Sequence, residues 1–222
     1  MTTRSGLLSL LTILCLLLAV APAMADTVYD NGPYNGTTDA WEINFGHAVS
    51  NSFSCGGYTC YYPFSIEGLN FVYWDAYDFS DVLTTVDMSI GSTSFGTDIF
   101  SGTLTGVTNT FLGFNQYGYY LFQAGYSFFL QYRYWNDAYY LTLQNACTTS
   151  GCSVSNPIYW DENSGSSTAY DDTLGSIPSE AFTLTGTECY WCGGTTPEPG
   201  SIILFGSGIL GLAGVLRRRL MG

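Results

Sequence analysis

Lysine is absent from this 222-residue chain, and histidine occurs once, at His47. Of the five arginines, only Arg133 lies between residues 26 and 196. Because phosphate binding needs clustered cations, we expect no nucleic acid partner and no adhesion of this segment to an anionic membrane face. A Ser-His-Asp hydrolase would depend on His47, and no strand–turn–helix nucleophile elbow is visible.

Carboxylates far outnumber cations in the same segment. It holds 17 Asp and Glu side chains against one arginine, for a formal net charge near −16. Surface acidity that keeps molecules soluble and apart is one interpretation. Binding of Ca²⁺, which takes several oxygen ligands from carboxylates and carbonyls, is the other.

Helical periodicity is also missing between the two apolar runs at the ends of the chain. Apolar and polar residues instead alternate with the period of half-buried strands at residues 41–46, 86–91, 139–144 and 181–185. Less regular β-rich runs cover residues 69–74, 99–104, 117–122 and 126–132, and turn formers such as Gly106, Asn115 and Gly125 separate them. We predict one all-β domain, an antiparallel β-sandwich of jelly-roll-like form.

Both ends of the chain carry transport signals. Arg4, the leucine-rich run 7–21 and Ala23-Met24-Ala25 form a signal peptide over residues 1–25. The domain then spans residues 26–196, a length that fits one domain with a sizeable core. A tail over residues 197–222 contains a 15-residue apolar run, 202–216. Its helix of about 22 Å falls short of the roughly 30 Å hydrocarbon core, so it is a marginal membrane-spanning segment.

The tail has three parts in a fixed order. Pro197-Glu198-Pro199 keeps the junction extended, the apolar run follows, and Arg217-Arg218-Arg219 should stay on the cytoplasmic side. This arrangement resembles the PEP-CTERM sorting signal. The resemblance implies recognition by an exosortase, cleavage near the triplet and transfer from a transient inner-membrane anchor to the cell surface or its exopolysaccharide matrix. An ordinary C-terminal membrane anchor is the alternative.

A second resemblance lies within the domain, clearest over residues 138–186. The segments 140–146, 157–167 and 177–183 are similar to exported domains that often accompany the PEP-CTERM tail. The resemblance implies the sandwich architecture and the export route, but no reaction.

Six cysteines remain once the signal peptide is removed. They form the near-neighbour pairs Cys55 and Cys60, Cys147 and Cys152, and Cys189 and Cys192. An even count in an exported chain indicates disulfides, and we expect each pair to close locally in a turn. A zinc site and, for Cys189 and Cys192, a redox motif are the alternatives.

Two acidic segments could supply calcium ligands. Asp161-Glu162-Asn163 and Asp171-Asp172 bring five oxygen-bearing side chains within a short stretch, separated by a flexible Gly165-Ser166-Ser167 segment. We expect the two loops at one end of the sandwich, holding Ca²⁺. The alternative is that Asp161 and Asn163 only cap a turn through their own backbone.

The chain offers more material for binding than for catalysis. Aromatic residues make up 17% of it, and exposed rings could stack on sugars, whereas most such rings fill cores. A glycosidase would need only two carboxylates. The ring candidates are Trp74, Tyr77, Tyr119, Tyr120, Trp135 and Trp160, and the carboxylate candidates are Glu42, Glu67, Glu162 and Glu180.

We therefore expect a non-enzymatic surface or exopolysaccharide-matrix protein with no cofactor other than Ca²⁺. A carbohydrate-binding module, in which Ca²⁺ could take part, is the alternative, and a glycoside hydrolase is the weaker one.

Overall fold

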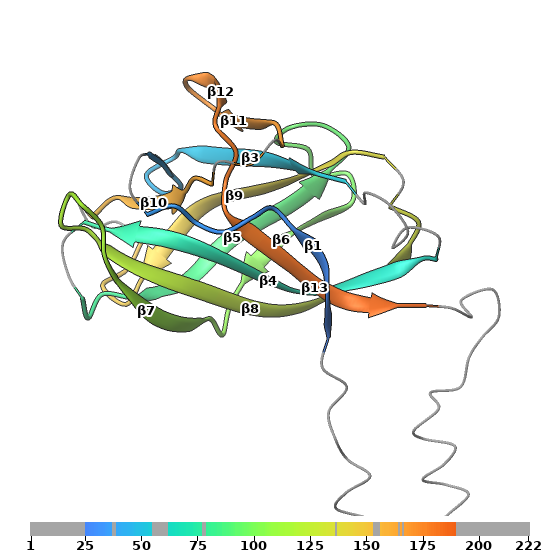
Figure 1. Ribbon diagram of the computed structural model, residues 1–222, viewed down its shortest axis with the longest axis horizontal. Helices are drawn as coiled ribbons and strands as arrows, with labels where there is room; N and C mark the ends of the chain where they lie inside the picture. Colours follow the sequence, from blue (N-terminus) through green and yellow to red (C-terminus); the bar gives the residue numbers. More distant parts are fainter. Residues whose placement is uncertain are drawn as a thin grey trace, which may run out of the picture.

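The computed structural model describes residues 25–189 apart from 37–38, 55–61, 77–78, 136, 153–155, 164 and 166. Two antiparallel sheets pack against each other (Figure 1). The antiparallel sandwich predicted from the sequence is confirmed, whereas its jelly-roll form remains a prediction. The expected signal-peptide and membrane helices lie outside the described residues, and within that described part no helix is long and apolar enough to cross a membrane.

The first sheet has seven strands. Its members are β1 (Asp26–Asp30), β2 (Ala40–Glu42), β4 (Phe64–Asp75), β7 (Thr108–Phe114), β8 (Tyr120–Arg133), β10 (Ile158–Asp161) and β13 (Phe182–Glu188). The second sheet has six strands in the order β12-β11-β3-β9-β5-β6. They are β3 (Ala48–Phe53), β5 (Leu83–Gly91), β6 (Phe100–Leu104), β9 (Tyr139–Thr148), β11 (Ala169–Asp171) and β12 (Gly175–Ile177).

Strand β4 organises the first sheet. One of its edges pairs with β8 along its whole length. The other edge is shared, because β13 pairs with residues 64–71 and β10 pairs with residues 73–75. On this edge, β4 therefore changes its pairing partner from β13 to β10 next to Tyr73. The candidate sites lie at the β10 end of the sandwich.

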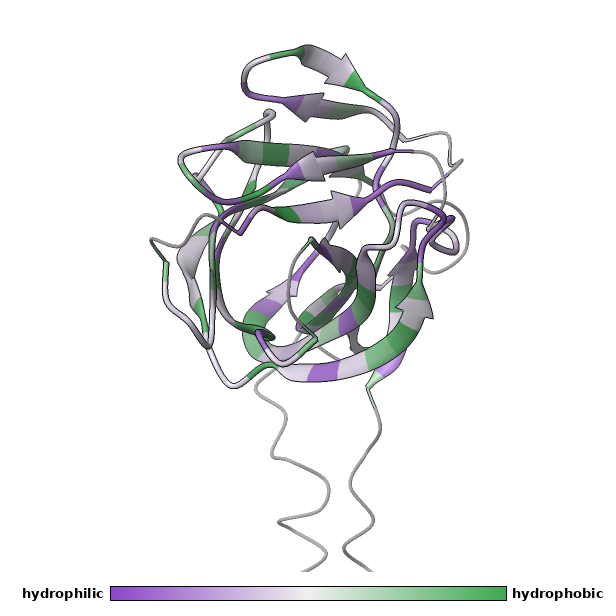
Figure 2. Ribbon diagram, turned by 90° about the vertical axis from the view of Figure 1, so that its left-hand side faces the viewer, coloured by the Kyte–Doolittle hydropathy of each residue, from purple (hydrophilic) through white to green (hydrophobic). Residues whose placement is uncertain are grey.

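The core lies between the sheets and follows the predicted alternation. Val86, Met88 and Ile90 on β5, and Leu141 and Leu143 on β9, are all buried. Figure 2 shows hydrophobic and hydrophilic positions alternating along the strands. Because successive strand residues face opposite sides, each of these strands gives one face to the core and the other to solvent or a neighbouring layer.

Two details of the sequence interpretation were wrong. Phe45, expected in a strand, is exposed in a turn with φ of 55°, because β2 ends at Glu42. Gly125, expected in a turn, lies within β8 opposite Asn70 and Thr108. A Cβ there would stand 2.8 Å from the side-chain oxygens of both neighbours, so the glycine serves close packing across three strands.

Candidate functional site

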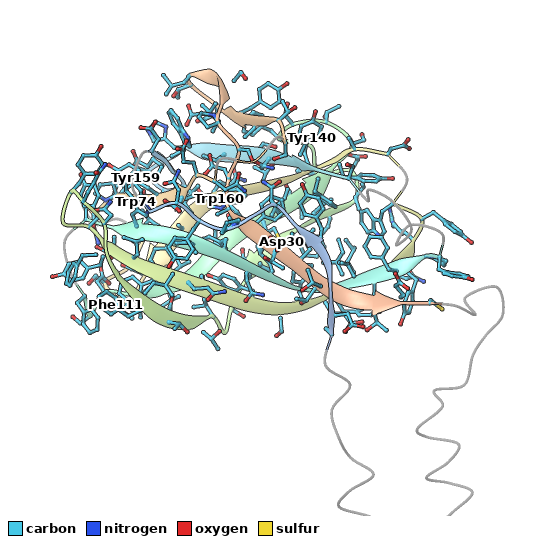
Figure 3. All side chains as sticks on the ribbon, viewed as in Figure 1. Asp30, Trp74, Phe111, Tyr140, Tyr159 and Trp160 are labelled. Carbon is cyan, nitrogen blue, oxygen red and sulfur yellow. A yellow bond between two sulfur atoms is a disulfide. The ribbon has the colours of Figure 1, made fainter. Side chains whose placement is uncertain are left out.

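An open hollow of about 330 Å³ lies on the outer face of the first sheet. We call it the aromatic hollow. It is lined by Asp39, Ala40, Trp74, Tyr117, Tyr119 and Tyr159. Figure 3 shows Trp74 and Tyr159 together at one end of the molecule.

Strand register places the first two rings. Trp74 on β4 is directly opposite Tyr159 on β10, so their side chains share one face. Tyr73, the residue before Trp74, is directly opposite Trp160, the residue after Tyr159. Both of these side chains are fully buried on the core side of the sheet. The same pairing therefore fills the core with one pair of rings and lines the hollow with the other.

A turn before β8 supplies the other two rings. The Asn115 side-chain oxygen accepts hydrogen bonds from the backbone N–H groups of Tyr117 and Tyr119, both at 2.9 Å. Tyr119 then packs 5.8 Å from the Trp74 ring and 6.2 Å from the Tyr159 ring, centroid to centroid. Tyr117 lies 6.4 Å from Trp74 and is 60% exposed, so its ring forms the outer wall of the aromatic hollow.

A buried carboxylate fixes the Trp74 ring. The indole N–H donates to Asp161 Oδ1 at 2.6 Å, and Asp161 Oδ2 accepts from the backbone N–H groups of Asn35 and Gly36. Burial nevertheless raises the pKa of Asp161 to about 7, because desolvation outweighs the three hydrogen bonds. Asp161 thus holds the Trp74 side chain in position at the aromatic hollow.

The predicted aromatic candidates separate into three groups. Trp74 and Tyr119 line the hollow. Trp74 is only 4% exposed, because Tyr117 and Tyr119 pack against its ring, so the tyrosines offer most of the accessible aromatic surface. Trp135 and Trp160 are core residues, 1% and 0% exposed, so the expectation that they face a ligand was wrong. Tyr120 packs with Phe111 and Phe114 elsewhere, and Tyr77 lies outside the described residues.

Tyr117 and Tyr159 were missed as lining residues. The Asn115 turn is visible in the sequence and could have indicated Tyr117. Tyr159 depends on the pairing of two strands far apart in the chain, for which the sequence gives no local signal.

A second feature is a buried acidic cluster between the sheets, consisting of Glu162, Asp171 and Glu180. Glu162 and Glu180 are opposed in an isolated antiparallel bridge, which directs their side chains to the same face. Glu180 is 0% exposed, and neither of its carboxylate oxygens has a hydrogen-bond partner. Burial, followed by repulsion from Asp161, Glu162, Asp171 and Asp39, raises the pKa of Glu180 well above its usual value.

The second sheet contributes Asp171. It is opposite the fully buried Val49 in the β11–β3 register and therefore faces the interior. Its Oδ1 accepts hydrogen bonds from Thr173 N and Oγ1 and from Leu174 N at 2.6–2.8 Å. Burial alone would raise the pKa of Asp171, but these bonds outweigh it and hold the pKa below its usual value.

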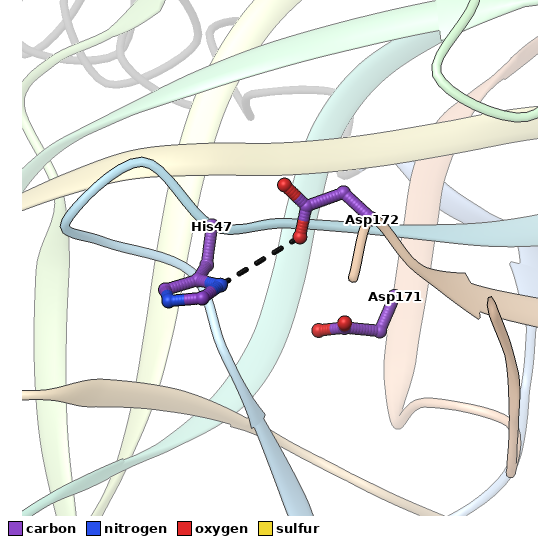
Figure 4. A group of neighbouring side chains, drawn as sticks. All are labelled: His47, Asp171 and Asp172. Carbon is purple, nitrogen blue, oxygen red and sulfur yellow. Dashed lines mark ion pairs between the residues drawn. The ribbon is translucent and has the colours of Figure 1, made fainter. Parts of the chain in front are cut away.

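A histidine stands beside Asp171 nearer the surface. Potential ligand atoms of His47, Asp171 and Asp172 lie within 4.8 Å of one another (Figure 4). His47 Nδ1 is 3.7 Å from Asp172 Oδ1, and its Nε2 is 3.9 Å from Glu42 Oε2.

The five predicted calcium ligands do not share one environment. Glu162 and Asp171 belong to the acidic cluster, and Asp172 faces His47. Asp161 supports the aromatic hollow through its three hydrogen bonds. Asn163 Oδ1 accepts from Gly165 N and Ser179 Oγ, as in the turn-capping alternative. The structure adds Glu180, which the sequence offered only as a hydrolase carboxylate.

The hydrolase carboxylates do not gather around the aromatic hollow. Glu42 lies near His47, and Glu67 accepts a 2.6 Å hydrogen bond from Ser65 Oγ on β4. Glu162 is 7% exposed and Glu180 is closed to solvent. Among the described residues, Asp39 is the carboxylate that lines the hollow.

Local disulfide pairing is confirmed for one pair. Cys147 and Cys152 are bonded, with Cα atoms 4.3 Å apart. Cys189 is also disulfide-bonded. Cys55, Cys60 and Cys192 lie outside the described residues, so local pairing at those positions stays a prediction.

Comparison with known proteins identifies the tail. A family model described as the PEP-CTERM protein-sorting motif matches residues 195–219. No curated protein and no solved structure matches the chain. The predicted sorting signal, which contains Pro197-Glu198-Pro199 and Arg217-Arg218-Arg219, is therefore confirmed. The motif implies an exported protein that an exosortase processes and whose C-terminal tail is membrane-anchored beforehand.

Proposed function

We propose that this exported protein is a non-enzymatic component of the cell surface or exopolysaccharide matrix that binds polysaccharide in the aromatic hollow. The observation that carries the proposal is the gathering of Trp74, Tyr117, Tyr119 and Tyr159 around one open hollow. Its residues come from segments far apart in the chain, β4, the 115–119 turn and β10.

The chemistry of the hollow suits a sugar. Aromatic faces accept the apolar C–H faces of a pyranose, while tyrosine hydroxyls and the Asp39 carboxylate can exchange hydrogen bonds with sugar hydroxyls. The formal net charge of residues 26–196, near −16, repels anionic polymers. We therefore propose a neutral glycan as the ligand.

The lining is held in place before any ligand arrives. Asp161 fixes the Trp74 indole, and the Asn115 side chain fixes the turn that carries Tyr117 and Tyr119. Ordering side chains on binding costs free energy, so a preformed surface binds more tightly than a mobile one with the same contacts.

The burial of Glu162 and Glu180 supports a non-catalytic role for the protein. Glu162 and Glu180 lie on one face of the sheet but are almost closed to solvent. A glycosidic bond must reach both carboxylates of a hydrolase.

Glycan-array binding followed by calorimetry on the mature exported protein tests the proposal. Tyr119→Ala should weaken binding of a neutral glycan by about 1 kcal/mol, roughly fivefold in Kd, because one stacking face is lost. Tyr134→Ala is the matched control, since Tyr134 is 62% exposed and does not line the hollow. Equal losses in the two variants, or no binding to any neutral glycan, would contradict the proposal.

Self-assembly is a second candidate role, favoured by an exposed aromatic group on β7. Phe111 and Phe114 on β7 are 39% and 63% exposed. Phe79, which precedes β5 and is 51% exposed, packs 4.8 Å from Phe111, centroid to centroid. Within the described residues β7 pairs only with β8, so its other edge is open to a second copy. Sedimentation should then show concentration-dependent dimers that Phe114→Ser removes.

A further inference from the structure

A histidine and three carboxylates meet at the end of β2, the start of β3 and the end of β11. Nδ1 of His47 lies 3.7 Å from Oδ1 of Asp172. The potential ligand atoms of these two residues and of Asp171 all lie within 4.8 Å of one another (Figure 4). The other ring nitrogen, Nε2, lies 3.9 Å from Oε2 of Glu42. The two nitrogens of His47 therefore face different carboxylates.

Backbone hydrogen bonds bring these side chains together. Strand β11 pairs with β3 as far as Asp171, and the N–H of the next residue, Asp172, donates to the carbonyl of Ala48 at 3.1 Å. The N–H of His47 donates to the carbonyl of Asn44 at 3.0 Å, which closes the turn before β3. The main chain thus places one imidazole beside two carboxylates without help from a ligand.

Asp171 is buried, at 5% exposure, and its carboxylate is only half satisfied. Its hydrogen bonds, from Thr173 and Leu174, all go to Oδ1, and within the described part of the chain no donor reaches Oδ2. Figure 4 shows this carboxylate directed towards the His47 ring. Arg133, the one arginine of residues 26–196, lies on β8 in the other sheet. A negative oxygen on a buried side chain is costly unless a hydrogen-bond donor or a cation compensates it.

We propose that Nδ1 of His47 and the carboxylates of Asp171 and Asp172 bind a divalent first-row transition-metal ion, represented by Zn²⁺. Carboxylates alone would not indicate a site. The independent observations are the imidazole nitrogen that faces both acids and the unpartnered Oδ2 of Asp171. Glu42 stands where a metal-binding histidine usually has a carboxylate, beside the other ring nitrogen. The site does not depend on glycan binding.

The donor set selects the kind of metal. An imidazole with two carboxylates suits Zn²⁺ and related ions, whereas Ca²⁺ takes 6 to 8 oxygens. Two ligands of a tetrahedral zinc ion stand about 3.4 Å apart, because each bond is about 2.1 Å long. The 3.7 Å between His47 and Asp172 is close to this separation. Their side chains are 37% and 32% exposed, so an ion and a water as fourth ligand can enter from solvent.

Magnetic resonance of the imidazole tests the site. His47 is the only histidine of the chain, so its ring nitrogens give unambiguous signals in the mature exported protein prepared without an affinity tag. One equivalent of Zn²⁺ should move the Nδ1 signal to its metal-bound position and leave Nε2 protonated, whereas Ca²⁺ should leave both signals in place. Unchanged ring signals would reduce His47 to an ion-pair partner of the acids, and metal on Nε2 would place the ion elsewhere. Either result would overturn the proposal.

Substitutions of partly exposed side chains identify the other ligands. Asp172→Asn should weaken Zn²⁺ binding by at least about tenfold in calorimetric titration, and Glu42→Gln by about tenfold without abolishing it, because the ring loses its orienting partner. Asp137→Asn is the matched control, since Asp137 is exposed and lies just before Tyr139, at the opposite end of β3 from His47. Thermal unfolding in chelator shows that each variant folds. Equal Kd values for Asp172→Asn and Asp137→Asn would overturn the assignment.

Discussion

At the scale of single residues, buried polar side chains decide the local structure at this end of the sandwich. The Asn163 amide group donates to the carbonyls of Asn31 and Glu180, and its oxygen accepts from Ser179. Asn31 in turn donates to Ser179 Oγ at 2.9 Å. A network with these partners satisfied rigidifies its surroundings. The side chain of Asn163, a candidate calcium ligand by sequence, is thus occupied by internal hydrogen bonds.

Asp161 should make stability depend on pH. Its pKa is about 7 in the folded protein and about 4 in an unfolded chain, so the folded state binds the proton more tightly. The contribution of this group is complete below pH 4 and is lost as the pH rises through 7, by a few kcal/mol at most. Urea unfolding in chelator should show the free energy of unfolding falling between pH 4 and pH 8.

Asp161→Asn should reduce that decline, although it also loses hydrogen-bond acceptance from Asn35 or Gly36. The slope against pH, and not the absolute stability, is the measurement. Glu180 contributes in the same direction and remains in both proteins, so the difference in slope isolates Asp161. Identical slopes would show that the Asp161 pKa is not raised.

At the scale of elements, a tight turn holds the end of strand β9, which pairs with the distant strands β3 and β5. Strand β9 ends in a tight turn where Thr148 and Gly151 bond to each other through their backbones. Asp81 Oδ1 accepts from Thr149 Oγ1 and Ser150 N at 2.8 Å. The Cys147–Cys152 disulfide closes the same turn. Backbone, carboxylate and disulfide thus all hold the end of one strand.

Replacing both Cys147 and Cys152 by serine should lower the free energy of unfolding by about 2 kcal/mol, because the closed loop is short and constrains the unfolded chain only modestly. Urea unfolding under oxidising conditions measures the loss, with the single variant Thr149→Ser as a control for the turn. A double variant as stable as the wild type, or a peptide map that joins Cys147 to another group, would refute this local role.

At the scale of the whole molecule, processing should separate the domain from its tail. The PEP-CTERM motif at residues 195–219 implies exosortase cleavage, so protein recovered from outside the cell should begin near Asp26 and end near Pro197–Pro199. Intact-mass analysis measures both ends. A catalytically dead exosortase strain is the control and should retain the full tail. Arg217-Arg218-Arg219 on all of the recovered protein would exclude cleavage.

The sequence by itself determined the local and covalent properties of this protein. Alternation with a period of two predicted the strands at residues 86–91, 139–144 and 181–185, because it reflects burial of one strand face. The net charge follows from composition alone. The Cys147–Cys152 disulfide and the sorting tail could be predicted because each depends on residues close together in the chain.

Only the tertiary structure decided which side chains meet. Trp74 and Tyr159 are separated by 85 positions yet share one register pair, while Trp160, next to Tyr159, is core. Glu180 gained its buried, unpartnered state from the bridge with Glu162 and from the second sheet packed above it. Strand register and sheet packing are set by contacts between distant segments, and a one-residue change of register would exchange the hollow and the core.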